Sequence, residues 1–193
     1  TILLFVAFSL ILPKFLQAGN ILSLIRSVAV LGVLSLGMLI VVLGRGIDLS
    51  IVANMAISVA WTIQLVNDGT SVPLAMGLGV GFALVMSVIT GVLVAYAEIP
   101  PLFATLAMAT FIYGFGRAHL IVGTDVVYLP PKFGWIAWLG QGTLYGVPTP
   151  IVVAAVLALI VFGLLRALKP GVFIFAIGDN MAAARIGGVS VRP

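Results

Sequence analysis

Long apolar stretches, each ended by a short polar break, decide what this chain can fold into. About twenty residues of helix rise about 30 Å, which is the thickness of a bilayer's hydrocarbon core. Hydrophobic residues make up 63% of the sequence and charged residues 7%, whereas a soluble domain carries about 25% charged residues. The sequence therefore predicts an all-α polytopic membrane protein with about six transmembrane helices, at 1–12, 21–43, 51–66, 73–97, 102–120 and 148–168.

Several functional classes are excluded or disfavoured by the same sequence. The apolar stretches do not alternate strictly, which favours helices over a barrel. There is no cysteine and one histidine, His119, so neither a thiol site nor a multi-histidine metal site is possible within one chain. The net charge of +4 is spread out and suits loops near lipid headgroups better than a nucleic-acid surface. No HExxH, GxSxG, CxxC or GxxxxGK[ST] motif occurs. We therefore expect no catalytic residue, metal or bound cofactor, and energy from a partner or an ion gradient.

The break at 44–50, with the sequence GRGIDLS, holds the main candidates for chemistry. A charge at membrane depth costs about 3 kcal/mol, so Asp48 is a functional candidate by default. Arg45 lies three residues earlier and can form a local ion pair with it. One interpretation is a broken helix that lines a polar cavity, which Asn54 could also face. The other is an interfacial turn in which Asp48 caps the next helix and Asn54 joins neighbouring helices.

Two further features bear on packing and orientation. Gly77 and Gly81 form a GxxxG motif, which permits close helix contact but is also common in ordinary packing. The segment 121–147 is predicted to be a loop, and its Trp135, Trp138 and Tyr145 suit a membrane interface.

The last stretch, 169–193, is too short and too polar to span a bilayer. Pro170-Gly171 predicts a helix stop followed by a hinge. Asn180 is placed to cap a short helix, MAAARIGG, that ends at Gly187-Gly188.

The basic residues indicate how the chain is oriented in the membrane, if every break reverses its direction. One side of the membrane then carries Arg45, Arg166, Lys169, Arg185 and Arg192, and the other side carries Lys14, Arg26, Arg117 and Lys132. Because cytoplasmic loops carry more basic residues than external ones, the side with five of them, which includes 170–193, is predicted to be cytoplasmic. We interpret 1–193 as a single transmembrane domain, truncated at both ends, of a longer protein.

Four stretches in a fixed order carry a resemblance to a known family. They are VLGVLSLGMLIVVLGRGIDLS, IPPLFATLAMATFIYGFGRAHLIVG, VPTPI and FAIGDNMAAARIGGVSV. Together they resemble the membrane permease subunit of bacterial ABC importers of the ribose, xylose and galactose type. The family's GID element falls on Gly46, Ile47 and Asp48, and its double proline falls on Pro100 and Pro101, followed by Ala104-Thr105-Leu106.

The resemblance implies a permease subunit of the bacterial inner membrane that works by alternating access. Its implied partners are an ATP-binding cassette subunit that holds ATP-Mg, a periplasmic solute-binding protein that meets the 121–147 loop, and a second permease subunit. The substrate pathway is expected to include Asp48, Ser50, Asn54, Arg45 and Thr105. The loop that couples to the ATPase is expected to include Gly178, Asp179, Asn180, Ala183, Ala184, Arg185 and Gly188.

The chain departs from the family's pattern at three places. One is Val52-Ala53-Asn54, where the family has Val-Gly-Ser. Arg45 stands where many relatives have glycine, and Met181-Ala182 stand where the coupling loop often carries glutamate. Three alternatives remain open: an ion-coupled carrier or channel, an intramembrane enzyme, and a nonfunctional paralogue. The first lacks the several intramembrane charges such carriers use, and the second lacks a nucleophile and base.

Overall fold

The computed structural model describes residues 2–123, 126–130 and 134–189. The chain forms two compact units, Thr1–Leu36 with Trp135–Val161, and Gly37–Gly134 with Phe162–Pro193. The elements are α1 (Ile2–Ile11), α2 (Ala18–Leu43), α3 (Ile51–Asn67), α4 (Val72–Ala95), α5 (Pro101–Phe115), the π-helical turn η1 (Gly116–Leu120), α6 (Gly134–Gln141), β1 (Thr143–Leu144), β2 (Val147–Pro148), α7 (Thr149–Ala167), α8 (Lys169–Asp179) and α9 (Met181–Ile186). Helices therefore dominate the described residues, as the sequence predicts.

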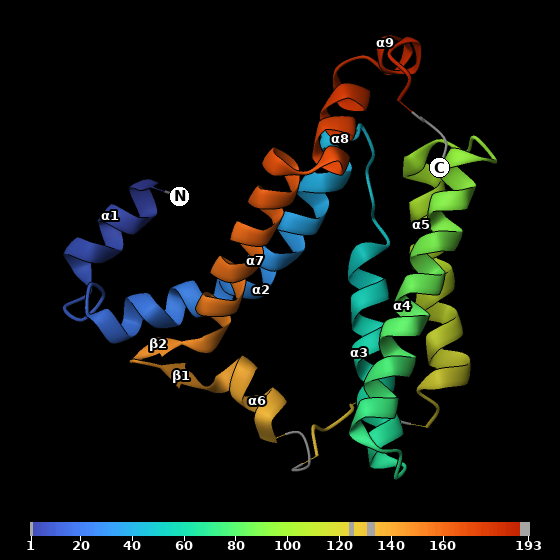
Figure 1. Cartoon of the computed structure of the whole chain (residues 1–193). Helices are drawn as coiled ribbons and strands as arrows, with labels where there is room; N and C mark the ends of the chain where they lie inside the picture. Colours follow the sequence, from blue (N-terminus) through green and yellow to red (C-terminus); the bar gives the residue numbers. More distant parts are fainter. Residues whose placement is uncertain (1, 124–125, 131–133, 190–193) are drawn as a thin grey trace. The chain divides into compact units, whose positions relative to one another are not determined.

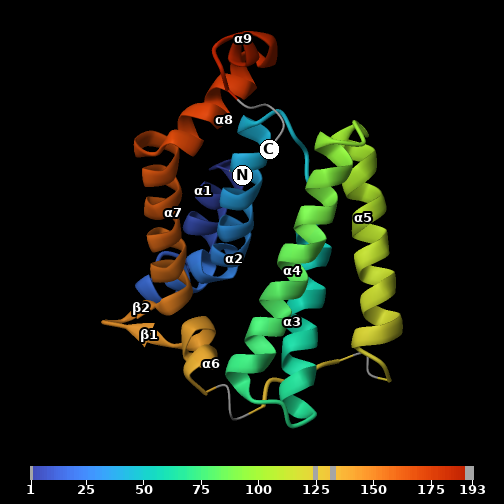
Figure 2. The same cartoon turned by 45° about the vertical axis from the view of Figure 1, so that its right-hand side comes forward.

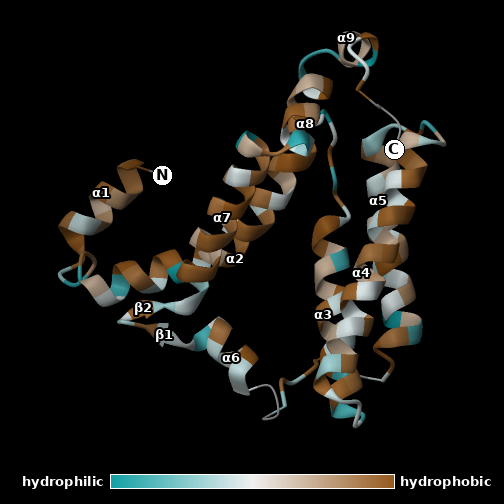
Figure 3. Cartoon of the chain, in the orientation of Figure 1, coloured by the Kyte–Doolittle hydropathy of each residue, from teal (hydrophilic) through white to brown (hydrophobic). Residues whose placement is uncertain are grey.

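Three of these helices, α2, α4 and α7, are long and apolar enough to cross a membrane. Figure 3 shows hydrophobic colour along all three, and more hydrophilic colour at turns between helices. The apolar helices α1 and α3 are shorter. The predicted helix positions are close to those observed, but the count of about six transmembrane helices is not confirmed.

In the second unit, α3, α4 and α5 lie side by side and enclose its core (Figures 1 and 2). The buried core side chains are Ile57, Met86, Met108, Ile112 and Ile121. Helix α4 approaches α3 at Gly79, where an added Cβ would collide with the side chain of Thr62. No atom lies within 4 Å of the Cβ position of Gly77 or of Gly81. Within the described residues, the close α3–α4 contact is thus made by Gly79 rather than by the GxxxG pair.

In the first unit, the segment predicted as a simple loop contains α6 and a hairpin, which corrects that prediction. Strands β1 and β2 pair in antiparallel register. The two residues between them, Tyr145 and Gly146, both have positive φ (50° and 82°), as a two-residue hairpin turn requires. Arg26 of α2 donates to the carbonyl oxygen of Gly140 at 3.1 Å and so holds the end of α6. Lys132 and Arg192, which entered the charge balance, lie outside the described residues.

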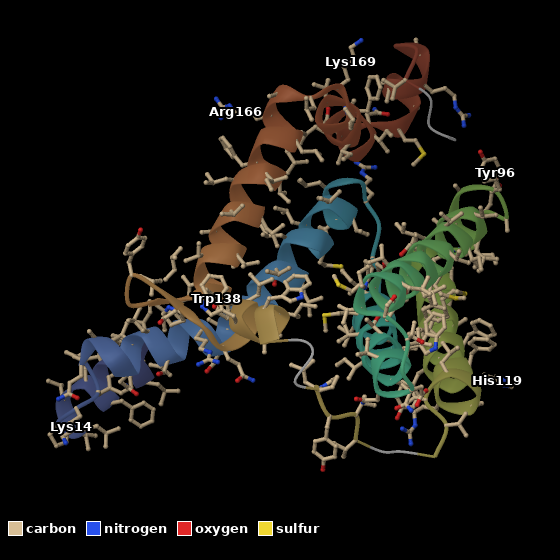
Figure 4. The ribbon with its side chains drawn as sticks, turned by 60° about the horizontal axis from the view of Figure 1, so that its bottom comes forward. Lys14, Tyr96, His119, Trp138, Arg166 and Lys169 are labelled. Atoms are coloured by element: carbon tan, nitrogen blue, oxygen red, sulfur yellow. The ribbon has the colours of Figure 1, made fainter. Side chains whose placement is uncertain are left out.

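The hinge predicted after Pro170 is also wrong, because α8 begins at Lys169 and is helical throughout. Proline is tolerated in the first turn of a helix, since its missing N–H has no helical partner there. Gly171 leaves no room for a Cβ beside the backbone of Leu165, so only glycine permits this sharp junction. Arg166 and Lys169 project from the junction of α7 and α8, whereas Tyr96 and His119 lie near opposite ends of the α3–α4–α5 bundle (Figure 4).

Candidate functional site

The candidate site begins where the chain leaves helical geometry between α2 and α3. Gly44 and Gly46 still donate to carbonyls of the last turn of α2, at 2.9 to 3.3 Å. Arg45 between them has φ 62°, a left-handed conformation that favours glycine. The backbone from Gly46 to Ser50 is then non-helical until α3 starts at Ile51. The break predicted at 44–50 is therefore present in the structure.

Asp48 organises this break through a local hydrogen-bonded turn. Its Oδ1 accepts from the backbone N–H of Ser50 at 2.8 Å and from the Ser50 hydroxyl at 2.6 Å. Ser50 occupies the N-cap position of α3 and is buried, but its own side chain makes no cap bond. Asp48 thus supports the start of α3 from two residues before it. Among the described residues no ion pair joins Asp48 to Arg45, so the predicted local pair is not formed.

Asp48 also lines a cavity of about 220 Å³ between the break, α4 and α5. Its other polar lining residues are Ser87 and Thr90 from α4 and Thr105 from α5. Thr105 is buried, and its hydroxyl donates to the carbonyl oxygen of Ile47 at 3.2 Å, so that it satisfies one backbone group of the break. Sites for drug-sized ligands usually occupy about 300–1,000 Å³, so this cavity is smaller than such a site. Its apolar walls are Val41, Gly46, Ile47, Gly91, Val94 and Pro101.

Ser87 and Thr90 were missed by the sequence reasoning. They lie three residues apart within the apolar run of α4, and residues at that spacing share one face of a helix. Paired hydroxyls on one face of a spanning helix were the signal that could have found them.

Asn54 joins α3 to α4 beside this cavity without lining it. Its Nδ2 donates to the carbonyl oxygen of Ala83 at 3.0 Å and to the Ser87 hydroxyl at 3.1 Å. Its Oδ1 accepts from the Ser58 hydroxyl at 3.4 Å. The geometry matches the interhelical alternative for Asn54, and Ser87 links this network to the cavity wall.

Arg45 points to α8 rather than into the cavity. Its Nε donates to the carbonyl oxygen of Gly178 at 2.6 Å, and its Nη2 donates to that of Asp179 at 2.7 Å. These carbonyls belong to the last turn of α8, whose C=O groups have no partner within the helix. A cation also suits the negative end of a helix dipole. The break is therefore tied directly to the segment that precedes α9.

The short helix predicted after Asn180 is present as α9. The Asn180 side chain accepts from the backbone N–H groups of Ala182 and Ala183 at 3.0 and 3.1 Å. The helix ends at Gly187, and Gly188 follows with φ 82°. The predicted cap at each end of this segment is confirmed.

Three of the residues expected to contact an ATPase lie on α9 itself, and they differ in exposure. Ala184 is buried against its own chain, whereas Ala183 and Arg185 are exposed. Ile186 is 89% exposed and Met181 46% exposed. The sequence analysis assigned no contact role to these two apolar side chains.

Three relatives of known name resemble this chain over most of its length. The galactofuranose transporter permease protein YtfT of Escherichia coli (strain K12) is 36% identical over 95% of this chain and 55% of its own length. The ribose import permease protein RbsC of Bacillus subtilis (strain 168) is 33% identical over 98% of this chain and 58% of its own. RbsC of Escherichia coli (strain K12) is 28% identical over 93% and 56%. The chain thus spans a little over half the length of these relatives. No solved structure matches.

A family model matches most of the sequence. It is described as the permease component of the branched-chain amino acid transport system, and it covers residues 20–193. The match includes the break at 44–50, the cavity-lining helices α4 and α5, and α9. Together with the apolar helices α2, α4 and α7, the match shows that this chain is part of a multi-pass membrane protein and belongs to that permease family.

Proposed function

We propose that this chain is part of the transmembrane permease subunit of an ATP-driven ABC importer. The subunit moves a sugar or a similar small polar solute across the bacterial inner membrane by alternating access. It makes and breaks no covalent bond, and ATP-Mg is bound and hydrolysed on a separate subunit. Family membership supports the permease role, and the names of the sugar-transporting relatives support the substrate class.

The chemistry of the cavity supports a polyhydroxylated substrate. Carboxylate oxygens accept hydrogen bonds, and the hydroxyls of Ser and Thr both donate and accept. Asp48, Ser87, Thr90 and Thr105 therefore offer partners for sugar hydroxyls within one small cavity.

The exposed face of α9 supports coupling to an ATPase. Ala183 is small and allows close approach, Arg185 can pair with an acidic groove, and Ile186 adds apolar area. Helix α9 follows α8 directly, and α8 is tied to the break by Arg45. Asp179 and Asn180 form the junction, where Asn180 caps α9.

The remaining partners follow from the importer role. A periplasmic solute-binding protein delivers the substrate to the face that carries 121–147, and a second permease subunit completes the pathway. The cytoplasmic location of 170–193 follows the weak excess of basic residues on that side.

One observation carries the proposal most directly. Asp48, which lines the cavity, and Arg45, which binds the carbonyls that precede α9, lie three residues apart on the same break. An importer needs such a connection, because a movement of the ATPase must change access to the substrate.

Uptake by proteoliposomes tests the proposal. The full-length subunit is reconstituted with its co-purifying partners, with ATP or a non-hydrolysable analogue on the side of the ATPase, and labelled ribose is the first probe. We expect uptake with ATP, none with the analogue, and no effect of ionophores. Uptake that needs no ATP and collapses with ionophores would instead establish an ion-coupled carrier.

A further inference from the structure

We propose that Arg45 is a positioning residue that makes the break and the C-terminal end of α8 move as one body, so that it sets how tightly α9 is coupled to the cavity. This inference rests on the proposed function, because it assigns a coupling role within the importer.

The contact itself is a two-point attachment. The Arg45 guanidinium uses two different nitrogens for two consecutive carbonyls, at 2.6 and 2.7 Å. A planar guanidinium held at two points fixes orientation as well as distance. Hydrogen bonds from a charged donor are worth more than neutral ones. The two bonds therefore fix both the position and the orientation of the last turn of α8 relative to the break.

A backbone contact closes the same joint. Gly178 lies so close to the carbonyl oxygen of Leu43 that a Cβ at Gly178 would collide with it. Leu43 is the last residue of α2, and Gly178 is the next-to-last residue of α8. Two helix ends that meet through backbone atoms have no flexible side chain between them to absorb a displacement. A shift of α8 must therefore move the break or separate the joint.

The conformation of Arg45 indicates that its side chain has a role of its own. Its φ of 62° is in the left-handed region, which is unfavourable for a residue other than glycine. Glycine would occupy this position without that cost. The strained residue holds the joint through its side chain, and Asp48 lies only three residues further along the same break.

The test uses Arg45→Gly, which removes the guanidinium and also relieves the backbone. Relief of the left-handed backbone offsets part of the stability that is lost with the two hydrogen bonds. The matched control is Arg26→Ala, which removes a similar arginine-to-carbonyl hydrogen bond from the first unit. The readout is substrate taken up per ATP hydrolysed by the reconstituted complex, a ratio that a loss of folded protein does not change.

We expect the ratio to fall about tenfold in Arg45→Gly, the scale of one charged hydrogen bond, and to stay unchanged in Arg26→Ala. An unchanged ratio in Arg45→Gly, or an equal fall in both variants, would overturn the inference. If the unmodified complex shows no ATP-dependent uptake, the proposed function fails instead.

A second readout tests the joint without any transport. Spin labels can be attached to cysteines introduced at Val52 of α3 and Phe175 of α8, both exposed, in a full-length subunit in which any other cysteine is replaced by serine. We expect a narrow distribution of label-to-label distances in the full-length subunit and a broader one in Arg45→Gly. Identical distributions would show that Arg45 does not hold the joint.

Discussion

The side chain of Arg45 donates a hydrogen bond of 2.6 Å to the carbonyl oxygen of Gly178, although the two residues are 133 positions apart. This bond, with its neighbour to Asp179, connects the non-helical break after α2 to the end of α8. The break carries Asp48 at the cavity, and α8 leads into the capped helix α9. Two segments that lie far apart in the sequence are thus joined by direct hydrogen bonds.

Replacing Gly178 with alanine should weaken this joint from the other side. Its Cβ would meet the backbone oxygen of Leu43, which cannot move aside as a side chain can. Overpacking of this kind costs about 1–3 kcal/mol, so we expect a lower unfolding temperature in detergent. Gly163→Ala in α7 is the control, because no atom lies within 4 Å of its Cβ position. Equal unfolding temperatures for the two variants would contradict the close contact.

Two substitutions at Asp48 distinguish the effect of its charge on transport from the effect of its hydrogen bonds to Ser50. Asp48→Ala removes both and should lower transport. Asp48→Asn keeps a carbonyl oxygen that can accept from the N–H and hydroxyl of Ser50. If the carboxylate binds substrate, transport by proteoliposomes falls in both variants while subunit assembly stays intact. Full transport by Asp48→Asn would show that Asp48 only stabilises the start of α3 and that its charge does not bind substrate.

Removing the cap of α9 should loosen that helix. Asn180→Ala deletes the acceptor for the N–H groups of Ala182 and Ala183, and such a loss costs about 1 kcal/mol. Hydrogen exchange at those two amides should therefore accelerate about fivefold. Asn180→Ser keeps a capping oxygen and should restore slow exchange, since serine caps about as well as asparagine. Fast exchange in both variants would argue that the side-chain cap is not what orders α9.

The contact between α3 and α4 gives a prediction that distinguishes neighbouring glycines. Gly79→Val should destabilise the subunit, because Thr62 already fills the space a side chain would need. Gly77→Val should leave stability nearly unchanged, since its Cβ position is open. Thermal unfolding of the two variants in the same detergent checks this. A larger loss of thermal stability in Gly77→Val than in Gly79→Val would indicate that the GxxxG pair makes the α3–α4 contact.

The local features of this chain were predictable because they depend on neighbouring residues. Apolar length predicted the helices, the glycines around Arg45 predicted the break, and Asn180 with Gly187-Gly188 predicted α9. The prediction of a hinge after Pro170 was wrong, because a proline that ends one helix is equally compatible with the first turn of the next.

The contacts between distant segments were not predictable in the same way. Arg45 was paired with Asp48 because the two are close in sequence, whereas its observed partners, Gly178 and Asp179, lie far along the chain. Ser87 and Thr90 join Asp48 at the cavity only because the fold brings α4 against the break. Nothing in the order of residues states which helix faces which.

Co-purification tests whether α9 docks on an ATPase. The full-length subunit is isolated from its own membranes in mild detergent, and its partners are identified by mass spectrometry. The key variant is Ala183→Arg, which adds a bulky charge to the exposed face of α9, and the control is Ser71→Arg, which adds the same charge at the exposed turn after α3. We expect an ATPase with a phosphate loop to co-purify with the unmodified subunit and with Ser71→Arg. We expect no ATPase to co-purify with Ala183→Arg. Absence of any ATPase from the unmodified subunit, or equal recovery with Ala183→Arg, would contradict the docking of α9 on an ATPase.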